Sequence, residues 1–393
     1  MAGVKPGIVD EQCEMLKAQG GSGSFAVAVV NNSLWAKPCS HGQDNTKEAD
    51  FAHIILILAQ LLEAIPVDDC VMIFNTGDQP AISKAMFGGM LPVLEYSGST
   101  STYTIVMPSC FHIERALGNG RDVPNGSAVP WEDRSPLAWW RGTMSLPDFV
   151  PVSSMLQLPR IQLLKVATQH PELFDVALTG LDEAINNPAV VQNALKEAGV
   201  NLEDVGPHRR QRLVTEAPMR KILLNVNAVV QSWRLHDLLL TGSALVLQHH
   251  SATEWLMRRL TPWEHYVPLR EDSSNLLEAV RWLRHNDSAA RSLADAAYRV
   301  GKAYARDSEV YCFFAHVMRA FAVVPRSWSH GSGGSGQTKE MRRAGYKPAR
   351  TLLQVIREKD PHFRQRLRQV RHQRPLQSLL NGACERAHET PVS

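Results

Sequence analysis

The chain has 393 residues, of which 44% are hydrophobic and 21% are charged, with a formal net charge of +3. This composition is typical of a globular protein with two or more domains, and the net charge favours no particular class of partner. The longest apolar run, Ile54–Leu62, contains Gln60 and is too short to cross a bilayer, so we expect no transmembrane segment. The first residues show no basic region followed by an apolar core, so no secretory signal is expected there.

The first third of the chain alternates between helix and strand patterns. Gly7–Lys17 predicts a short amphipathic helix. Phe25–Val30 and Ser33–Trp35 predict a β-hairpin, because the turn residues Asn31 and Asn32 tolerate positive φ. Beyond the hairpin we expect a buried helix at Asp50–Ile65 and strands at Cys70–Phe74 and Tyr103–Met107.

The second half continues this α/β alternation. Ala184–Gly206 is polar and predicts a loop with short helices. Strands are expected at Ala138–Arg141, Phe174–Leu178, Ile222–Val226 and Ser243–Leu247, and helices at Ile161–Gln169, Leu235–Leu240, Asn275–Arg284, Ala289–Arg299 and Ser308–Ala322.

A candidate ligand site follows the strand at Ile222–Val226. A strand, helix and strand with buried strands build a parallel sheet, and ligands bind beyond the carboxyl ends of its strands. Gln231, Ser232 and Arg234 occupy this position near the start of the predicted helix. Backbone N–H groups, a hydroxyl and a guanidinium together suit a diphosphate. An ordinary helix with a capping serine and a surface arginine is the alternative interpretation.

Cysteine and histidine spacing predicts no metal site. The six cysteines form no CxxC pair, their pairing is not evident, and they leave the redox compartment open. Cys70 and Cys110 lie in or near apolar runs and are expected to be buried thiols. Asp68 and Asp69 precede a strand rather than follow one. The adjacent residues His249 and His250 point to opposite faces of an extended chain.

Four segments in a fixed order carry a family resemblance. They are WRGT at Trp140–Thr143, SWRLHDLLLTGS at Ser232–Ser243, TEW at Thr253–Trp255 and LTPWEHYVP at Leu260–Pro268. With these segments the chain resembles the CAP10-like protein O-glycosyltransferase family, which includes protein O-glucosyltransferases and fungal capsule xylosyltransferases. The resemblance runs from about Gly7 to Val323.

The resemblance implies an α/β fold of two Rossmann-like domains, of the GT-B glycosyltransferase type, with a basic C-terminal extension. The loop-rich stretch Gly118–Pro136 is the expected crossing between the domains. We therefore expect an acceptor-side domain over 1–130, a nucleotide-sugar domain over 131–305, a return helix over 306–324, and a flexible linker with a basic tail over 325–393.

Asp78 is the candidate general base. It follows a predicted strand in the loop NTGDQP, which begins at Asn75 and ends at Pro80. A carboxylate on such a loop can accept the proton of an attacking hydroxyl, although a turn aspartate bonding its own backbone is the simpler interpretation. The loop resembles the family's N-x-R-D-x-P motif, which implies the catalytic role. Gly77 stands where that motif usually has arginine.

The donor-binding residues implied by the resemblance are Arg141, Gly142, Thr143, Ser145, Ser232, Arg234 and Glu254. Arginine pairs with phosphate oxygens in a fork geometry, and glycine allows close approach of the backbone. The family motif F-R-G-S-x-T-S-P-E-R ends in an arginine at the position of Phe149 here, and His236 replaces a common lysine. Glu254 is expected either to bind ribose hydroxyls or to be structural.

The implied function is transfer of glucose or xylose from a UDP-sugar to a hydroxyl of a protein Ser/Thr or a glycan. The implied reaction is metal-independent and inverting, needs no cofactor beyond the donor, and takes place in the secretory-pathway lumen. The alternative is a degenerate family member that binds a nucleotide or a polyanion, suggested by Gly77, Phe149 and Thr104, where the family often has aspartate. The basic stretch Arg357–Arg374 could bind nucleic acid or anionic lipid, but a solvated appendage is the favoured interpretation.

Overall fold

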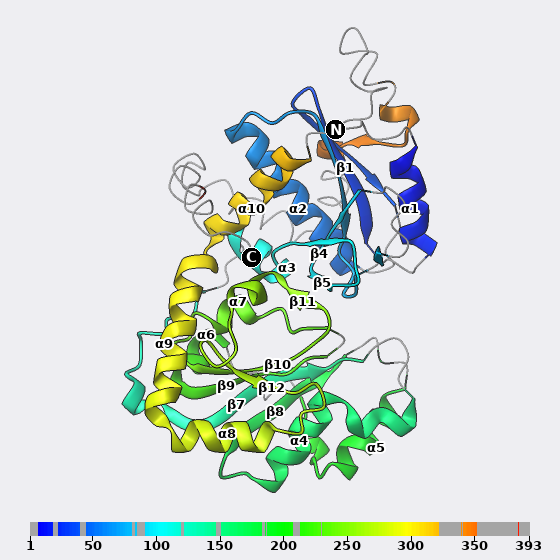
Figure 1. Ribbon diagram of the computed structural model, residues 1–393. Helices are drawn as coiled ribbons and strands as arrows, with labels where there is room; N and C mark the ends of the chain where they lie inside the picture. The colour runs from blue at the N-terminus through cyan, green and yellow to red at the C-terminus, as the bar shows by residue number, and fades with distance from the viewer. Residues whose placement is uncertain are drawn as a thin grey trace. The chain divides into compact units, whose positions relative to one another are not determined.

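The computed structural model describes residues 7–18, 23–39, 45–80, 83–84, 91–118, 122–146, 151–182, 185, 187–206, 213–228, 230–321, 339, 341–351 and 384. The chain forms two compact units (Figure 1). The first unit combines Met1–Arg121 with Arg306–Ser393, and the second is the continuous stretch Asp122–Ala305. None of the described helices is long and apolar enough to span a membrane.

The first unit is built on a mixed six-stranded sheet of order β13-β2-β1-β3-β4-β6. The predicted hairpin is confirmed: β1 and β2 pair antiparallel, and Asn31 and Asn32 have φ of 48° and 54°. The elements of this unit are α1 (Ile8–Ala18), β1 (Ser24–Val30), β2 (Ser33–Pro38), α2 (Asn45–Ala64), β3 (Cys70–Asn75), β4 (Val93–Glu95), β5 (Ser97–Gly98), β6 (Thr104–Val106), α3 (Cys110–Ala116), α10 (Asp307–Ala320) and β13 (Lys347–Pro348).

The C-terminal part of the first unit is more ordered than the sequence predicted. We expected a flexible linker and tail over 325–393, yet the described stretch 341–351 is folded. β13 pairs antiparallel with β2, and Met341 and Tyr346 are buried in the same core cluster as Ile8 and Leu16 of α1. The basic stretch 357–374 lies outside the described residues, as does most of the linker.

Two disulfides also lie in the first unit. They join Cys13 to Cys39 and Cys312 to Cys384, pairings that were not evident from the sequence. Of the two expected buried thiols, Cys70 is buried and Cys110 is half-buried, and neither forms a disulfide. Burial raises the pKa of the Cys70 thiol to about 12, so this thiol is protonated at neutral pH.

The second unit contains a fully parallel five-stranded sheet of order β12-β10-β9-β7-β8. Its helices and strands are η2 (Trp131–Asp133), β7 (Ser135–Met144), η3 (Val152–Gln157), α4 (Pro159–Gln169), β8 (Phe174–Leu181), α5 (Pro188–Glu197), η4 (Leu202–Asp204), α6 (Leu213–Glu216), η6 (Ala217–Met219), β9 (Arg220–Asn225), α7 (Leu235–Leu238), β10 (Ala244–Gln248), β11 (Thr253–Glu254), η7 (Trp255–Arg259), β12 (Val267–Leu269), α8 (Leu276–His285) and α9 (Asp287–Tyr304).

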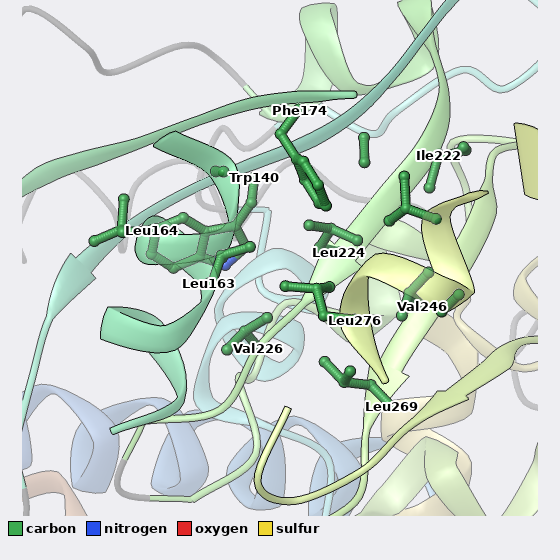
Figure 2. Close-up of a cluster of buried hydrophobic side chains, with 14 of the residues drawn as sticks. Trp140, Leu163, Leu164, Phe174, Ile222, Leu224, Val226, Val246, Leu269 and Leu276 are labelled. Atoms are coloured by element: carbon green, nitrogen blue, oxygen red, sulfur yellow. The ribbon is translucent and has the colours of Figure 1, made fainter. Parts of the chain in front are cut away.

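Side chains alternate between the two faces of this sheet, as the period of a strand requires. Trp140 belongs to the cluster that α4, α5 and α8 cover, whereas Trp139 belongs to the cluster beside α7. In Figure 2 the indole of Trp140 lies beside Leu163 and Leu164 of α4. The predicted α/β class is therefore confirmed, and the first sheet is mixed because the hairpin adds antiparallel strands to it.

Candidate functional site

The Asp78 loop leaves the carboxyl end of β3 in the first unit. Asn75, the last residue of β3, is 1% exposed, and its side-chain Oδ1 accepts a hydrogen bond from the N–H of Gly77 at 3.1 Å. Its Nδ2 contacts the carbonyl oxygen of Gln79 at 3.3 Å, and the hydroxyl of Ser97 donates to the carbonyl of Asp78 at 2.8 Å. The backbone of this loop is thus fixed on both sides of Asp78, whose side chain is exposed.

Two arginines, of which Arg160 is buried and Arg234 half-buried, share one indole ring in the second unit. The guanidinium carbon of Arg234 lies 5.7 Å from the ring centroid of Trp140, and that of Arg160 lies 5.6 Å from it. Arg234 donates to the carbonyl of Arg141 and, at 3.3 Å, to Oδ1 of Asn225. These contacts place Arg234 between the carboxyl ends of neighbouring strands, β7 and β9.

Arg160 lies at the first turn of α4 and reaches back to the segment after β7. It donates to the carbonyl of Thr143 and to the hydroxyl of Ser145, the latter at 3.2 Å. Burial, and then the positive charge of Arg234, lower the pKa of Arg160 to about 9. Burial lowers the pKa of Arg234 to about 10. Both guanidiniums are therefore held in surroundings that disfavour their charge.

No carboxylate among the described residues forms an ion pair with either of these two arginines. Nε of Arg160 and Nη2 of Arg234 are buried and have no hydrogen-bond partner within the described part of the chain. Two cations close together with unused N–H groups are a candidate site for an anion, because an anion would satisfy the donors and offset the repulsion. We call Arg160 and Arg234 the arginine pair.

Arg141 has different partners. Its Nη2 lies 2.6 Å from Oδ1 of Asp175, whose Oδ2 lies 3.0 Å from Nη2 of Arg220. Its Nη1 donates to the carbonyl oxygens of Asp175 and Trp140 at 2.8 and 3.0 Å. Arg141 therefore ties β7 to β8, and its guanidinium faces Trp139 at 5.4 Å rather than Trp140.

Packing within the strand explains why residue 142 is a glycine. A Cβ at Gly142 would lie 2.6 Å from Cζ2 of Trp140, so glycine leaves room for the indole above the strand.

The helix predicted at Leu235–Leu240 is shorter than expected, because α7 covers four residues. Such a helix is too short to hold an anion through an aligned dipole. Ser232, just before it, is half-buried, and its carbonyl contacts Asn225 Nδ2 at 3.5 Å.

Glu254 follows the carboxyl end of β10. Its backbone N–H donates to Oε1 of Gln231 at 2.9 Å, which joins the segments after β9 and β10. The side chain is 4% exposed, and its Oε1 is without a hydrogen-bond partner in the ranges that the structure describes. Burial raises the pKa of Glu254 to about 8, so the carboxyl group is predominantly protonated at neutral pH.

The structure thus brings together Arg234, Thr143 and Ser145 and adds Arg160, which sequence reasoning missed. Phe149 lies outside the described residues. In the described ranges, no three His, Cys, Asp or Glu side chains gather as a metal site would require.

The two units and the arginine pair define an α/β protein of the Rossmann-like class, with a candidate site for an anionic ligand at the strand ends of its parallel sheet. The chain belongs to glycosyl transferase family 90, whose sequence profile matches residues 5–328.

Curated relatives are protein O-glucosyltransferases. The chain is 27% identical to protein O-glucosyltransferase 2 of Danio rerio, over 68% of this chain and 50% of that protein. It is 25% identical to protein O-glucosyltransferase 3 of Homo sapiens, over 68% and 49%. It is 24% identical to human protein O-glucosyltransferase 1, over 67% and 64%. The chain therefore spans about half the length of the first two relatives.

Solved structures give weaker likenesses. A glycosyltransferase from Rickettsia africae aligns with a TM-score of 0.38 and 8% identity, over 72% of this chain and 83% of that chain. A sucrose-phosphate synthase from Thermosynechococcus elongatus aligns with a TM-score of 0.37 and 12% identity, over 60% of each chain.

Proposed function

We propose that this chain transfers a sugar from a nucleoside diphosphate sugar to a hydroxyl group of a protein. The observation that carries the proposal is the arginine pair: Arg160 and Arg234 share the ring of Trp140, form no ion pair with a carboxylate among the described residues, and each have one buried N–H group without a hydrogen-bond partner there. Membership of family 90 and the names of the relatives support sugar transfer. We propose UDP-glucose as the first donor to test and UDP-xylose as the second.

The proposed chemistry divides between the two units. When the bond from the anomeric carbon to the diphosphate breaks, negative charge grows on the leaving phosphate oxygens. The arginine pair would stabilise that charge, and preorganised donors in a buried site act most strongly on charge that develops during the reaction. In this assignment the arginine pair binds the diphosphate, so we propose a reaction without a metal ion.

In the other unit, Asp78 would take the proton of the attacking serine, threonine or glycan hydroxyl. A single displacement with such a base inverts the configuration at the anomeric carbon. Glu254 would accept or donate hydrogen bonds to the ribose hydroxyls of the donor. Ser145, Thr143 and Ser232 would complete the donor site beside the arginine pair, while Arg141 and Gly142 would maintain the strand that carries it.

Residence in the secretory pathway belongs to this proposal. Disulfides persist in oxidising compartments, and the pairs Cys13–Cys39 and Cys312–Cys384 support that location.

The test compares UDP binding with sugar transfer. Arg160→Gln and Arg234→Gln should each weaken UDP binding by roughly tenfold or more in calorimetry, because a hydrogen bond to a charged group is worth about 1.5–3 kcal/mol. Arg291→Gln is the matched control, since Arg291 is exposed and pairs with Glu132. Asp78→Asn should keep UDP affinity and lose transfer.

The outcomes separate the candidate functions. UDP binding without turnover of either donor, in the presence of a protein acceptor, would favour the degenerate binding protein. Full UDP affinity in both arginine variants would refute the donor site.

A further inference from the structure

A second buried polar network lies at the carboxyl ends of β3, β4 and β6. Glu95, the last residue of β4, is 1% exposed and stands opposite Asn75 in the parallel register of β3 and β4. One oxygen of its carboxylate, Oε1, accepts a hydrogen bond from Nδ2 of Asn75 at 2.8 Å. The other, Oε2, accepts one from the hydroxyl of Thr104 on β6. A carboxylate is thus held between three strands directly behind the Asp78 loop.

The contact with Glu95 determines which way the Asn75 amide points. Oε1 of Glu95 accepts a hydrogen bond in this contact, so the NH₂ group of Asn75, the donor end of its amide, faces it. The Oδ1 of Asn75 is then directed to the N–H of Gly77 at 3.1 Å and to the hydroxyl of Ser24 at 3.2 Å. With the amide reversed, Asn75 would present NH₂ to the N–H of Gly77 and an oxygen to the carboxylate, and both contacts would be repulsive.

The same strand segment holds the loop at a second point. Ser97, two residues after Glu95, donates to the carbonyl oxygen of Asp78 at 2.8 Å. Asn75 contacts the loop on both sides of Asp78, through Gly77 and Gln79. The orientation of the Asn75 amide, which faces Glu95, and the Ser97 hydroxyl thus help to position Asp78, together with the Thr76 hydroxyl, which donates to the carbonyl of Gly23 at 3.0 Å.

We propose that Glu95 is a positioning residue for the transfer reaction: it orients Asn75 so that the loop holds Asp78 in one place. This inference rests on the proposed role of Asp78 as the general base. A misplacement of a reacting group by about 1 Å can lower a rate by about a hundredfold. Glu95 acts through Asn75 and affects the rate constant rather than the binding of the donor.

The experiment uses the full chain and exchanges the amide and carboxyl side chains of Asn75 and Glu95, singly and together. Glu95→Gln allows either orientation of Asn75, because glutamine both donates and accepts, and kcat should fall about tenfold. Asn75→Asp places two carboxylates together, and kcat should fall about a hundredfold. In the double variant Asn75→Asp/Glu95→Gln the glutamine NH₂ donates to the aspartate, whose other oxygen accepts from Gly77. The double variant should recover kcat to within about threefold of the wild type.

The controls separate this inference from a general loss of structure. Glu63→Gln, at an exposed position of α2, should leave kcat unchanged. UDP affinity should stay within about twofold of the wild type in every variant, because the arginine pair belongs to the other unit. Loss of UDP affinity together with kcat in the single variants, without recovery in the double variant, would show a structural role and overturn the proposal.

Asp78→Asn in the same assay separates the role of Asp78 as the base from the positioning role of Glu95. If Asp78→Asn keeps its activity, Asp78 is not the base and the proposed function fails together with this inference. If Asp78→Asn is inactive while Glu95→Gln keeps the wild-type kcat, the role of Asp78 as the general base is supported and only the positioning role of Glu95 is refuted.

Discussion

Replacing Arg160 by methionine should stabilise the ligand-free chain while weakening its donor binding. Burial and the charge of Arg234 lower the pKa of Arg160 to about 9. At about 1.4 kcal/mol per pKa unit, this fall means that the fold disfavours the charged side chain by about 5 kcal/mol. The penalty is fully present below pH 9 and declines as the arginine loses its proton at higher pH.

The substitution also removes favourable contacts. Arg160 donates to the carbonyl of Thr143 and to the hydroxyl of Ser145, and these contacts to a charged group are worth about 1.5 kcal/mol each at the lower end of their range. The net gain at pH 7 is then about 2 kcal/mol. For a unit of this size, that gain corresponds to an increase in Tm of roughly 4–8 °C.

The assay is thermal unfolding with and without UDP. UDP at a hundred times its Kd should stabilise the wild type by about 2.7 kcal/mol, and the same concentration should stabilise Arg160→Met far less. Arg141→Met is the matched comparison: it leaves Asp175 with Arg220 alone and should lower Tm. A lower Tm for Arg160→Met with unchanged UDP stabilisation would refute the idea that this arginine is held for an anion.

Three further predictions concern stability. Gly142→Ala should cost about 1–3 kcal/mol in chemical denaturation, because the new methyl group overlaps the ring of Trp140, and a wild-type midpoint would contradict the account of Gly142. Burial raises the pKa of Glu254 to about 8, whereas in the unfolded chain this carboxyl loses its proton at lower pH. The free energy of unfolding should therefore fall as pH rises from about 5 to 8. Glu254→Gln should flatten this dependence in denaturation series at each pH, and an unchanged slope would argue against a buried protonated carboxyl. Tyr346→Ala should destabilise the first unit by about 3–5 kcal/mol, and a variant as stable as the wild type would mean that the 341–351 segment adds little to the core.

Local patterns predicted many elements correctly, because their signals are contained in a few consecutive residues. The asparagine pair at Asn31 and Asn32 predicted the hairpin, and the apolar run at Ile222–Val226 predicted β9. The helix α5 lies in the polar stretch predicted as a loop with short helices, but its bounds could not be predicted. Its buried face consists of Val191, Ala194 and Leu195, too few apolar positions for a clear helical period.

The functional residues were harder to predict because their partners are distant in sequence. Arg160 was missed because it lies outside the segments that carry the resemblance, and its nearness to Arg234 comes from the fold, which places both guanidiniums at the ring of Trp140. Glu95 was missed because a single carboxylate in an apolar strand has no local signature. Its importance comes from the register of β3 and β4, which no periodicity encodes.

The division of the first unit has a consequence for synthesis of the chain. Its sheet needs β13, near the C-terminus, to cover the edge of β2, whereas the second unit is one continuous stretch. A chain emerging from the ribosome can therefore finish the second unit while the first still presents an open strand edge and part of its apolar core. Early termination would leave an intact parallel-sheet unit attached to an unfinished one, a species exposed to strand-edge aggregation and to capture by chaperones.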